Sequence, residues 1–191
     1  VLIDETTAKA ALKTKTTALD LDLVTGGAAC DAAVKLYREQ GVPRAMIAAG
    51  DSVGLYGQNL FGIPWTVSVQ SPFGKNAMAD LSLSGGFLST AGVNEKTFEE
   101  NGQTYHSILD PRTGYPADSG LASVTVLADS GVLSDALSAA CLVLGYENSL
   151  PLLEEYQAQA LFVTKEKTVY ATDGLKERVT LIDQTLTWAA T

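Results

Sequence analysis

One helical segment constrains the fold more strongly than any other part of the sequence. Residues 134–144 (SDALSAACLVL) carry small or apolar side chains on nearly every face. A helix with this pattern is stable in water only when other elements cover most of its surface. We therefore expect residues 134–144 to form a buried helix around which the rest of the chain packs.

Short strand-like segments separated by turn residues make up most of the remaining sequence. Residues 65–72 alternate apolar and polar side chains, and residues 121–129 are rich in β-branched residues; both patterns are typical of strands. Gly85-Gly86 and Asn101-Gly102 are typical of hairpin turns. The sequence predicts strands or hairpins over residues 18–24, 44–48, 65–72, 79–92, 96–110, 121–129, 160–172 and 179–183, with a short strand that ends at Gly57.

Two other segments have the spacing of helices. Apolar side chains recur every three or four positions over residues 28–40, and Gly41 follows as a helix stop. A further helix is predicted over residues 147–157. The expected fold class is therefore α+β, with antiparallel or mixed sheets of hairpins packed on two or three helices. Residues 1–17 are expected to form an N-terminal edge segment, and residues 18–191 a single domain.

Composition limits the classes of partner. Of the 191 residues, 46% are hydrophobic and 18% are charged, which is typical of a folded globular protein. The net charge is −9, so neither nucleic acid nor an anionic membrane is an expected partner. No apolar run reaches the ~18 residues of a transmembrane helix.

The opening at Val1, without a signal peptide, is typical of a trimmed or truncated chain. Cys30 and Cys141 are predicted to be buried thiols, and a disulfide between them is the alternative.

Two glycine-containing turns are candidates for ligand binding. Residues 25–27 (Thr-Gly-Gly) precede a predicted helix, and the N-terminus of a helix offers N–H groups to a phosphate. Residues 50–52 (Gly-Asp-Ser) form a second turn after a predicted buried strand. Plain turn geometry remains the alternative explanation for both.

Two further clusters carry groups that suit catalysis or metal binding. His106 is the only histidine and shares a loop with Asp110, Arg112 and Thr113. Histidine is the usual acid–base group near neutral pH, and Arg112 can bind an anion through two N–H groups. Asp135 opens the apolar helix and is a candidate Mg²⁺ ligand. The alternatives are a structural histidine and an acidic residue placed to suit the helix dipole.

Taken in order, these segments resemble the ApbE family, the FAD:protein FMN transferases first described as thiamine biosynthesis lipoproteins. The resemblance covers about residues 18–170, and from it we expect this chain to lack the family's N-terminal portion. The matching segments are DLDLVTGGAACDAA (20–33), the turn at Gly50, STAG (89–92), YHSILDPRTGYP (105–116) and SDALSAACLVLG (134–145).

The resemblance implies an α+β fold with a flavin site between two halves. It implies that the protein binds FAD and Mg²⁺ and transfers FMN to a Thr or Ser of a target flavoprotein, with release of AMP. It also implies a place in the bacterial cell envelope, on the outer face of the cytoplasmic membrane. A strand-rich unit without its N-terminal portion is expected to pair through an exposed edge with that portion or with another chain.

The resemblance also assigns residues to the site. It implies that Asp135 and the backbone carbonyl of Thr25 ligate magnesium, and that His106 and Asp110 have catalytic roles. The flavin-binding residues that it implies are Thr25, Gly26, Gly27, Gly50, Asp51, Thr90, Gly92, Ser107, Ile108, Arg112 and Thr113.

Three functional side chains of the family pattern are replaced in this sequence. The family's usual Lys is replaced by Gly26, its usual His by Ser107 with His106 one position earlier, and its usual Thr by Ala139. The missing Lys weakens the attraction for a diphosphate. Three interpretations therefore stay open: an active FMN transferase, an inactive ApbE-like flavin-binding or interaction module, and a small secreted binding protein with coincidental motifs.

Overall fold

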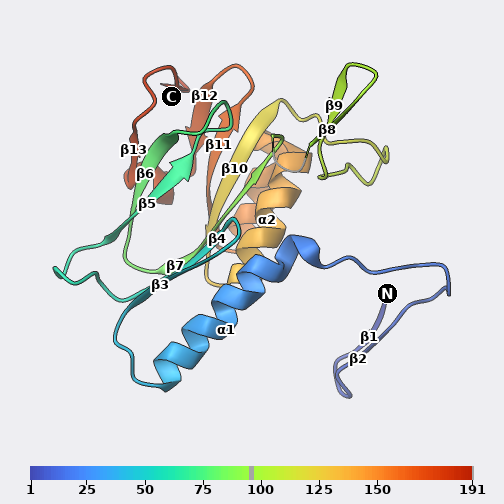
Figure 1. Ribbon diagram of the computed structural model, residues 1–191, viewed down its shortest axis with the longest axis horizontal. Helices are drawn as coiled ribbons and strands as arrows, with labels where there is room; N and C mark the ends of the chain where they lie inside the picture. The colour runs from blue at the N-terminus through green and yellow to red at the C-terminus, as the bar shows by residue number, and fades with distance from the viewer. Residues whose placement is uncertain (95–96, 191) are drawn as a thin grey trace.

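A seven-stranded sheet forms the centre of the molecule (Figure 1). The computed structural model describes residues 1–94 and 97–190. Neighbouring strands of this sheet are antiparallel, except for the parallel pair β12 and β14. In spatial order the strands are β14 (Thr187–Trp188), β12 (Thr168–Ala171), β11 (Gln159–Thr164), β10 (Leu121–Ala128), β7 (Gly86–Gly92), β4 (Ser52–Tyr56) and β3 (Ala45–Ala49).

A smaller sheet and two hairpins complete the β-structure. The smaller sheet packs against one face of the seven-stranded sheet, and one hairpin lies at the N-terminus. The smaller sheet holds β13 (Val179–Leu181), β6 (Ala77–Leu83) and β5 (Trp65–Gln70), and the hairpins pair β1 (Leu2–Asp4) with β2 (Lys9–Ala11) and β8 (Phe98–Glu100) with β9 (Gln103–Tyr105).

Helices cover the opposite face of the seven-stranded sheet. Helix α2 packs on β7 and β10, α3 packs beside α2, and α1 lies across β3, β4 and the N-terminal end of α2. The helical segments are η1 (Asp22–Val24), α1 (Thr25–Glu39), α2 (Gly131–Leu144), α3 (Tyr146–Glu155) and α4 (Asp173–Lys176). No helix of the described residues is long and apolar enough to cross a membrane.

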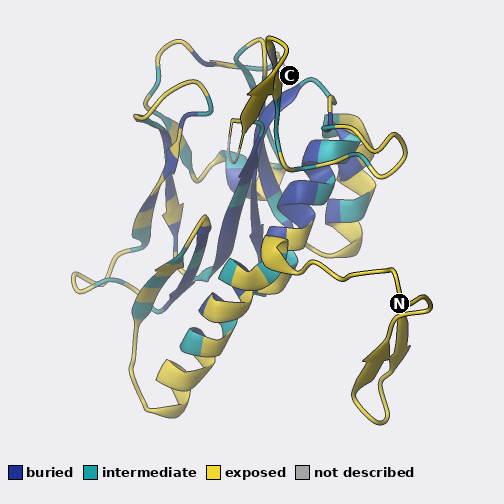
Figure 2. Ribbon diagram, turned by 45° about the vertical axis from the view of Figure 1, so that its right-hand side comes forward, coloured by how far each residue is buried: buried dark blue, intermediate teal, exposed yellow. Residues whose placement is uncertain are grey.

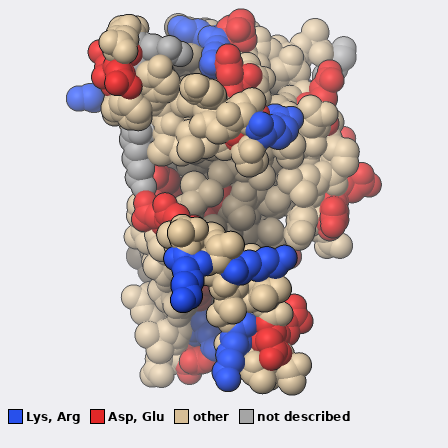
Figure 3. All heavy atoms as spheres, turned by 90° about the vertical axis from the view of Figure 1, so that its right-hand side faces the viewer, with Lys and Arg blue, Asp and Glu red and all other residues tan. Residues whose placement is uncertain are grey.

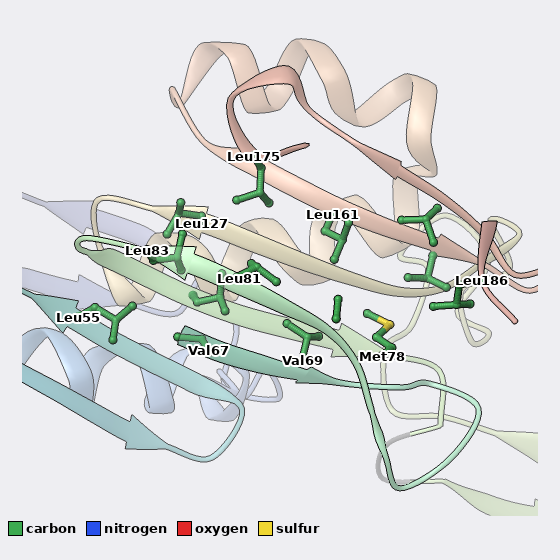
Figure 4. Close-up of a cluster of buried hydrophobic side chains, with 14 residues drawn as sticks. Leu55, Val67, Val69, Met78, Leu81, Leu83, Leu127, Leu161, Leu175 and Leu186 are labelled. Atoms are coloured by element: carbon green, nitrogen blue, oxygen red, sulfur yellow. The ribbon is translucent and has the colours of Figure 1, made fainter. Parts of the chain in front are cut away.

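The two sheets enclose one hydrophobic core (Figure 4). Leu55, Leu127 and Leu161 of the large sheet meet Val69 and Leu81 of the small sheet, and all five side chains are buried. Each such side chain contributes about 1.5–3 kcal/mol to folding through its burial. This core fixes the small sheet above the large one.

A second core lies between the large sheet and α2. Leu137 and Leu142 of α2 pack with Val124, Val126 and Phe162, and all five are buried. The buried helix expected over residues 134–144 is therefore confirmed, and so is the α+β class. The helix begins three residues earlier than predicted, because Ser130 caps it by accepting a hydrogen bond from the Leu133 N–H.

The hairpin at Asn101-Gly102 is confirmed, and that at Gly85-Gly86 is wrong. Asn101 and Gly102 both have positive φ (52° and 76°), as a tight hairpin turn requires. Lys96, at the start of the predicted hairpin, lies outside the described residues. The glycine pair does separate β6 from β7, but the two strands belong to different sheets. Strand β6 already has β5 and β13 on its two edges, so β7 pairs with β4 and β10 instead.

The strand predicted over residues 18–24 is also wrong. This segment runs as irregular chain into η1, and α1 begins directly at Thr25. Leu19, Leu21 and Leu23 are each more than half exposed, so the alternation of apolar and acidic residues faces no core. Without a buried face, the alternating pattern gives no reason to pair with a sheet.

The N-terminal hairpin stands away from the sheets. Every residue of β1 and β2 is exposed, and Figure 2 shows the hairpin carried beyond the end of α1 on an exposed segment. The division at residue 17 stays a prediction, because a hairpin that projects in this way does not fix a domain boundary.

Candidate functional site

The N-termini of α1 and α2 meet at two glycines. A Cβ atom on Gly27 would lie 2.0 Å from the carbonyl oxygen of Gly131, and one on Gly131 would lie 2.2 Å from the carbonyl oxygen of Gly27. Only glycine allows the two backbones to approach this closely. The turn at residues 25–27 therefore brings the start of α1 onto the start of α2.

This junction holds the carboxylate of Asp135 one turn into α2. Asp135 is only 4% exposed. Its Oδ2 accepts a hydrogen bond from the Gly27 N–H (2.6 Å), and its Oδ1 accepts one from the Ser52 hydroxyl (2.6 Å). Two charge-assisted hydrogen bonds fix the orientation of the carboxylate, while each oxygen keeps a lone pair for another partner.

The first amides of α2 are bound by Asp31 of α1. Asp31 Oδ1 accepts from the Gly131 N–H (2.8 Å), and its Oδ2 accepts from the Val132 N–H and the Ser130 hydroxyl, both at 3.1 Å. Each helix therefore has at least one N–H group at its N-terminus bound by a carboxylate of the other helix. A negative charge at a helix N-terminus is stabilising, so the two contacts reinforce one another.

A cavity of about 480 Å³ opens beside Asp135, and we call it the Asp135 cavity. Its wall combines the start of α1, the turn between β3 and β4, the strand β7 and the loop between β9 and β10 that contains Ser107. Most of the residues assigned to the site by resemblance lie around it. They are Thr25, Gly26, Gly50, Asp51, Thr90, Gly92, Ser107, Ile108 and Asp135.

His106 lies in the same loop but points elsewhere. Its Nε2 lies 3.1 Å from the backbone carbonyl oxygen of Ala117, and its Nδ1 is buried without a hydrogen-bond partner among the described residues. The next residue, Ser107, lines the Asp135 cavity while His106 does not. A catalytic role for His106 stays a prediction that needs a change of this loop.

Arg112 and Asp110 bind each other instead of a ligand. The Arg112 Nε–H donates to Asp110 Oδ1 (2.9 Å), and its Nη2 donates to Oδ2 (2.7 Å). The hydrogen bonds from Arg112 lower the pKa of Asp110 below its ordinary value. Thr113 closes the same turn, with its hydroxyl 3.4 Å from the carbonyl oxygen of Asp110. These three residues shape an exposed loop, and none of them lines the Asp135 cavity.

Sequence reasoning missed the partners of Asp135 in space. The sequence marks Ser52 only as part of a turn, and Ser52 lies 83 positions from Asp135 in the chain. Asp31 lies inside a matching motif that assigns it no role. Asp22 and Ser138, which also line the cavity, were not assigned either. No local pattern marks such residues, because their roles depend on how α1, β4 and α2 pack together.

The cavity is acidic. Asp22, Asp51 and Asp135 line it, and none of the described lining residues is Lys or Arg. On the face of the molecule that Figure 3 shows, basic and acidic side chains are interspersed, and neither sign forms a single continuous patch. An anionic ligand would therefore need a cation beside it. The described residues hold no group of three His, Cys, Asp or Glu side chains that could bind a metal unaided.

The oxygen donors present suit a metal that is shared with a ligand. Mg²⁺ commonly binds one or two protein carboxylates and completes its shell with phosphate oxygens and water. Asp135 supplies the buried carboxylate, and the Ser138 hydroxyl lies on the same wall of the cavity. This donor set fits Mg²⁺ with a bound diphosphate better than a metal held by protein ligands alone.

Comparison with known proteins agrees with this geometry. The sequence model of the ApbE family matches residues 1–162. The FAD:protein FMN transferase of Treponema pallidum is 34% identical over 86% of this chain and 49% of its own length. The FAD:protein FMN transferase of Klebsiella pneumoniae is 31% identical over 96% of this chain and 57% of its own length.

The solved structure of the ApbE protein from Thermotoga maritima has the same fold. It superposes with a TM-score of 0.84 at 28% identity, and the match covers 93% of this chain and 58% of that one. This chain therefore spans about half the length of the relatives it matches. Since the family model covers most of the chain, this protein belongs to the ApbE family.

Proposed function

We propose that this protein binds FAD with the diphosphate in the Asp135 cavity, together with Mg²⁺, and transfers FMN to a Thr or Ser of a target protein. The observation that carries the proposal is the fixed carboxylate of Asp135, buried and oriented by Gly27 and Ser52. The chain's FMN transferase relatives supply the substrate class.

The protein's own groups prepare the cavity for a charged ligand. Asp135 and the backbone carbonyl of Thr25 would hold the metal, and Thr25 and Gly26 place the N-terminus of α1 at the cavity wall. Val24 provides no side-chain cap for that N-terminus, and Asp135 already binds its Gly27 N–H. A helix N-terminus favours an anion beside it. A bound Mg²⁺ would neutralise the charge of the diphosphate and polarise its phosphorus–oxygen bonds.

The transfer itself would be a phosphoryl substitution. The acceptor hydroxyl oxygen forms a bond to the phosphorus of the FMN half, the bridging phosphorus–oxygen bond breaks, and AMP leaves with the bridging oxygen. The hydroxyl proton passes to a base. His106 and Asp110 are the candidate bases, and either requires the loop to turn toward the cavity, because both side chains bind other groups here.

A flavin-binding module without transfer is the second candidate. Two observations favour it. The side chains of His106 and Asp110 bind groups outside the cavity, and the backbone at Gly26 lies too close to its neighbours to carry the family's lysine. A Cβ there would lie 2.6 Å from the carbonyl oxygen of Ala49 and 2.7 Å from the Ser52 Oγ. A lysine at residue 26, as the family resemblance expects, would therefore displace the turn between β3 and β4.

Release of AMP separates the two candidates. The protein is incubated with FAD, Mg²⁺ and an acceptor that carries Thr or Ser hydroxyls, and AMP is quantified by chromatography for the wild type, Asp135→Asn and the control Asp118→Asn. Asp118 is an exposed acid that pairs with Lys165. AMP release in the wild type and control, but not in Asp135→Asn, supports the transferase. Binding of FAD without AMP release supports the module, and no binding of FAD contradicts both.

A further inference from the structure

The large sheet ends on one side at a strand whose outer edge is unprotected. Strand β3 pairs with β4, and no other strand of the described residues pairs with it. Its sequence, Ala-Met-Ile-Ala-Ala, contains no charge and no proline, and its register with β4 runs without a bulge. Natural sheets usually protect an edge with one of these devices, so an edge that lacks them is suited to pair with another strand.

The opposite edge of the same sheet is protected. Strand β14 has only two residues, and the Lys176 ammonium lies 5.8 Å from the centre of the Trp188 ring. A very short strand and a nearby charge both prevent pairing with another chain. Of the two edges of the large sheet, β3 is therefore the one that is open.

The turn that follows β3 determines which backbone groups face outward. Gly50 and Asp51 form a two-residue hairpin turn between Ala49 and Ser52, and Gly50 has the positive φ (59°) that such a turn requires. The residues that flank a two-residue turn form a hydrogen-bonded pair, and such pairs alternate along the strand. The N–H and C=O groups of Met46 and Ala48 therefore point away from β4, toward the open edge.

Helix α1 places apolar surface beside this edge. Gly26, Cys30 and Tyr37 lie on one face of the helix by their spacing. A Cβ on Gly26 would lie 2.6 Å from the Ala49 carbonyl oxygen, and the Cys30 Sγ lies 3.7 Å from the Ile47 carbonyl oxygen, so this face is turned toward β3. Tyr37, at the far end of the same face, is 41% exposed.

The loop after β4 adds apolar side chains near the start of β3. Asn59 Oδ1 accepts hydrogen bonds from the Phe61 N–H (2.8 Å) and the Ile63 N–H (3.3 Å), which hold the loop in shape. Arg44 Nη1 donates to the Asn59 carbonyl oxygen (3.1 Å), so the loop lies beside the residue that precedes β3. Leu60, Phe61 and Ile63 are each more than half exposed. Exposed apolar side chains that cluster in this way are typical of an interaction surface.

The charges at the two ends of β3 favour a second copy of this chain as the partner. Arg44 precedes the strand, Asp51 follows it, and both are exposed. When two such strands pair antiparallel about a two-fold axis, the Arg44 end of each lies beside the Asp51 end of the other. The open edge is therefore complementary in charge to itself.

We propose that two copies of this protein form a dimer by antiparallel pairing of their β3 strands, with Ile47 of one copy opposite Ile47 of the other. In this register Met46 of each copy lies opposite Ala48 of the second copy, and their outward N–H and C=O groups bond to one another. The paired strands alone are smaller than a stable interface, which buries about 1,200–2,000 Å². Tyr37 and the apolar loop supply further contact area. This inference does not depend on the proposed function.

The dimer would also change the charge around the candidate site. Gly50 and Asp51 line the Asp135 cavity, which has no Lys or Arg among its described lining residues. In the proposed register Arg44 of the second copy lies opposite Gly50. Pairing would therefore bring a positive charge close to the edge of an acidic cavity.

The test measures the mass of the protein in solution by size-exclusion chromatography with light scattering, over micromolar concentrations. The wild type is expected at twice the chain mass of 20.1 kDa. A wild type that stays at the mass of one chain overturns the proposal. A mass that rises beyond the dimer with concentration also overturns it, because two-fold pairing closes on itself.

Two double variants test the register at Met46 and Ala48, both of which are exposed in the single chain. The like-charge variant, Met46→Glu with Ala48→Glu, places two acids opposite each other twice. It should raise the dissociation constant of the dimer by about 10-fold or more. The opposite-charge variant, Met46→Lys with Ala48→Glu, places a base opposite an acid twice and should keep the dimer.

A control separates the effect of position from that of net charge. Gln157→Glu with Gln184→Glu adds the same two negative charges at exposed residues outside β3, and should keep the dimer. Circular dichroism should show the wild-type spectrum for all variants. A like-charge variant that remains as dimeric as the wild type overturns the proposal, because the contact then lies elsewhere. Loss of the dimer in both β3 variants also overturns it, because Met46 and Ala48 are then not opposite one another.

Discussion

Replacing Ser52 with alanine removes one of the two donors that hold the Asp135 carboxylate. Both residues are nearly inaccessible, at 3% and 4% exposure, and the hydroxyl lies 2.6 Å from Oδ1. A hydrogen bond to a buried charged group contributes about 1.5–3 kcal/mol to stability. We expect Ser52→Ala to lower the free energy of unfolding by about 2 kcal/mol, which is roughly 4–8 °C in melting temperature for a chain of this length.

The chain offers a matched control for this variant. The Ser68 hydroxyl donates to Asp80 Oδ1 at the same distance, 2.6 Å, but the pair is exposed. Water can replace the hydroxyl there, so Ser68→Ala should cost no more than about 0.5 kcal/mol. Urea unfolding of both variants, monitored by circular dichroism, measures the two free energies.

A double-mutant cycle identifies the interaction itself. Ser52→Ala is combined with Asp135→Asn, and the coupling energy between the two positions is expected to be about 1–3 kcal/mol. The reasoning is refuted if Ser52→Ala is as stable as Ser68→Ala, or if the two changes at the site are additive.

Three further predictions concern the junction, the exposed loop and the core. Gly131→Ala should lower stability by about 1–3 kcal/mol through the clash with the Gly27 carbonyl; a gain in urea resistance, as helix propensity alone predicts, would contradict this. Arg112→Ala should raise the pKa of Asp110 toward its ordinary value in an NMR titration. Because the wild-type carboxyl has a lowered pKa, its pairing stabilises the fold above the ordinary pKa and is lost as the pH falls through the lowered one; an unchanged pKa in the variant would refute this pairing. Phe162→Ala should lower the melting enthalpy and cost about 3–5 kcal/mol by calorimetry, since the ring is fully buried; a cost under about 1 kcal/mol would show that the site collapses.

Local patterns in the sequence were sufficient for the elements but not for their partners. The apolar helix over residues 134–144 is predictable because its own composition requires burial. The turn at Asn101-Gly102 is predictable because this residue pair favours positive φ. The Gly85-Gly86 pair does separate two strands. The sheet that each strand joins depends on which other strands offer a free edge, and those strands lie elsewhere in the sequence. The alternation over residues 18–24 misleads because nothing in the segment says whether a core lies beside it.

The candidate site shows the same limit. Thr25, Gly50 and Asp135 were expected at one site through family resemblance, and the structure gathers them around one cavity. The hydroxyl of Ser52 carries no signal of its own, because any serine in a strand looks alike in sequence. Its role arises only when segments far apart in the chain are packed together.

The most direct test of the proposed site is a titration of the protein with FAD by calorimetry, with and without Mg²⁺. The account predicts FAD binding that is much tighter with Mg²⁺, because the cavity around Asp135 is acidic and has no lining Lys or Arg among the described residues. It also predicts that Asp135→Asn loses the effect of Mg²⁺ while Asp118→Asn keeps it. Equal affinity with and without Mg²⁺ in the wild type, or no binding in either condition, would contradict the assignment of the Asp135 cavity as the diphosphate site.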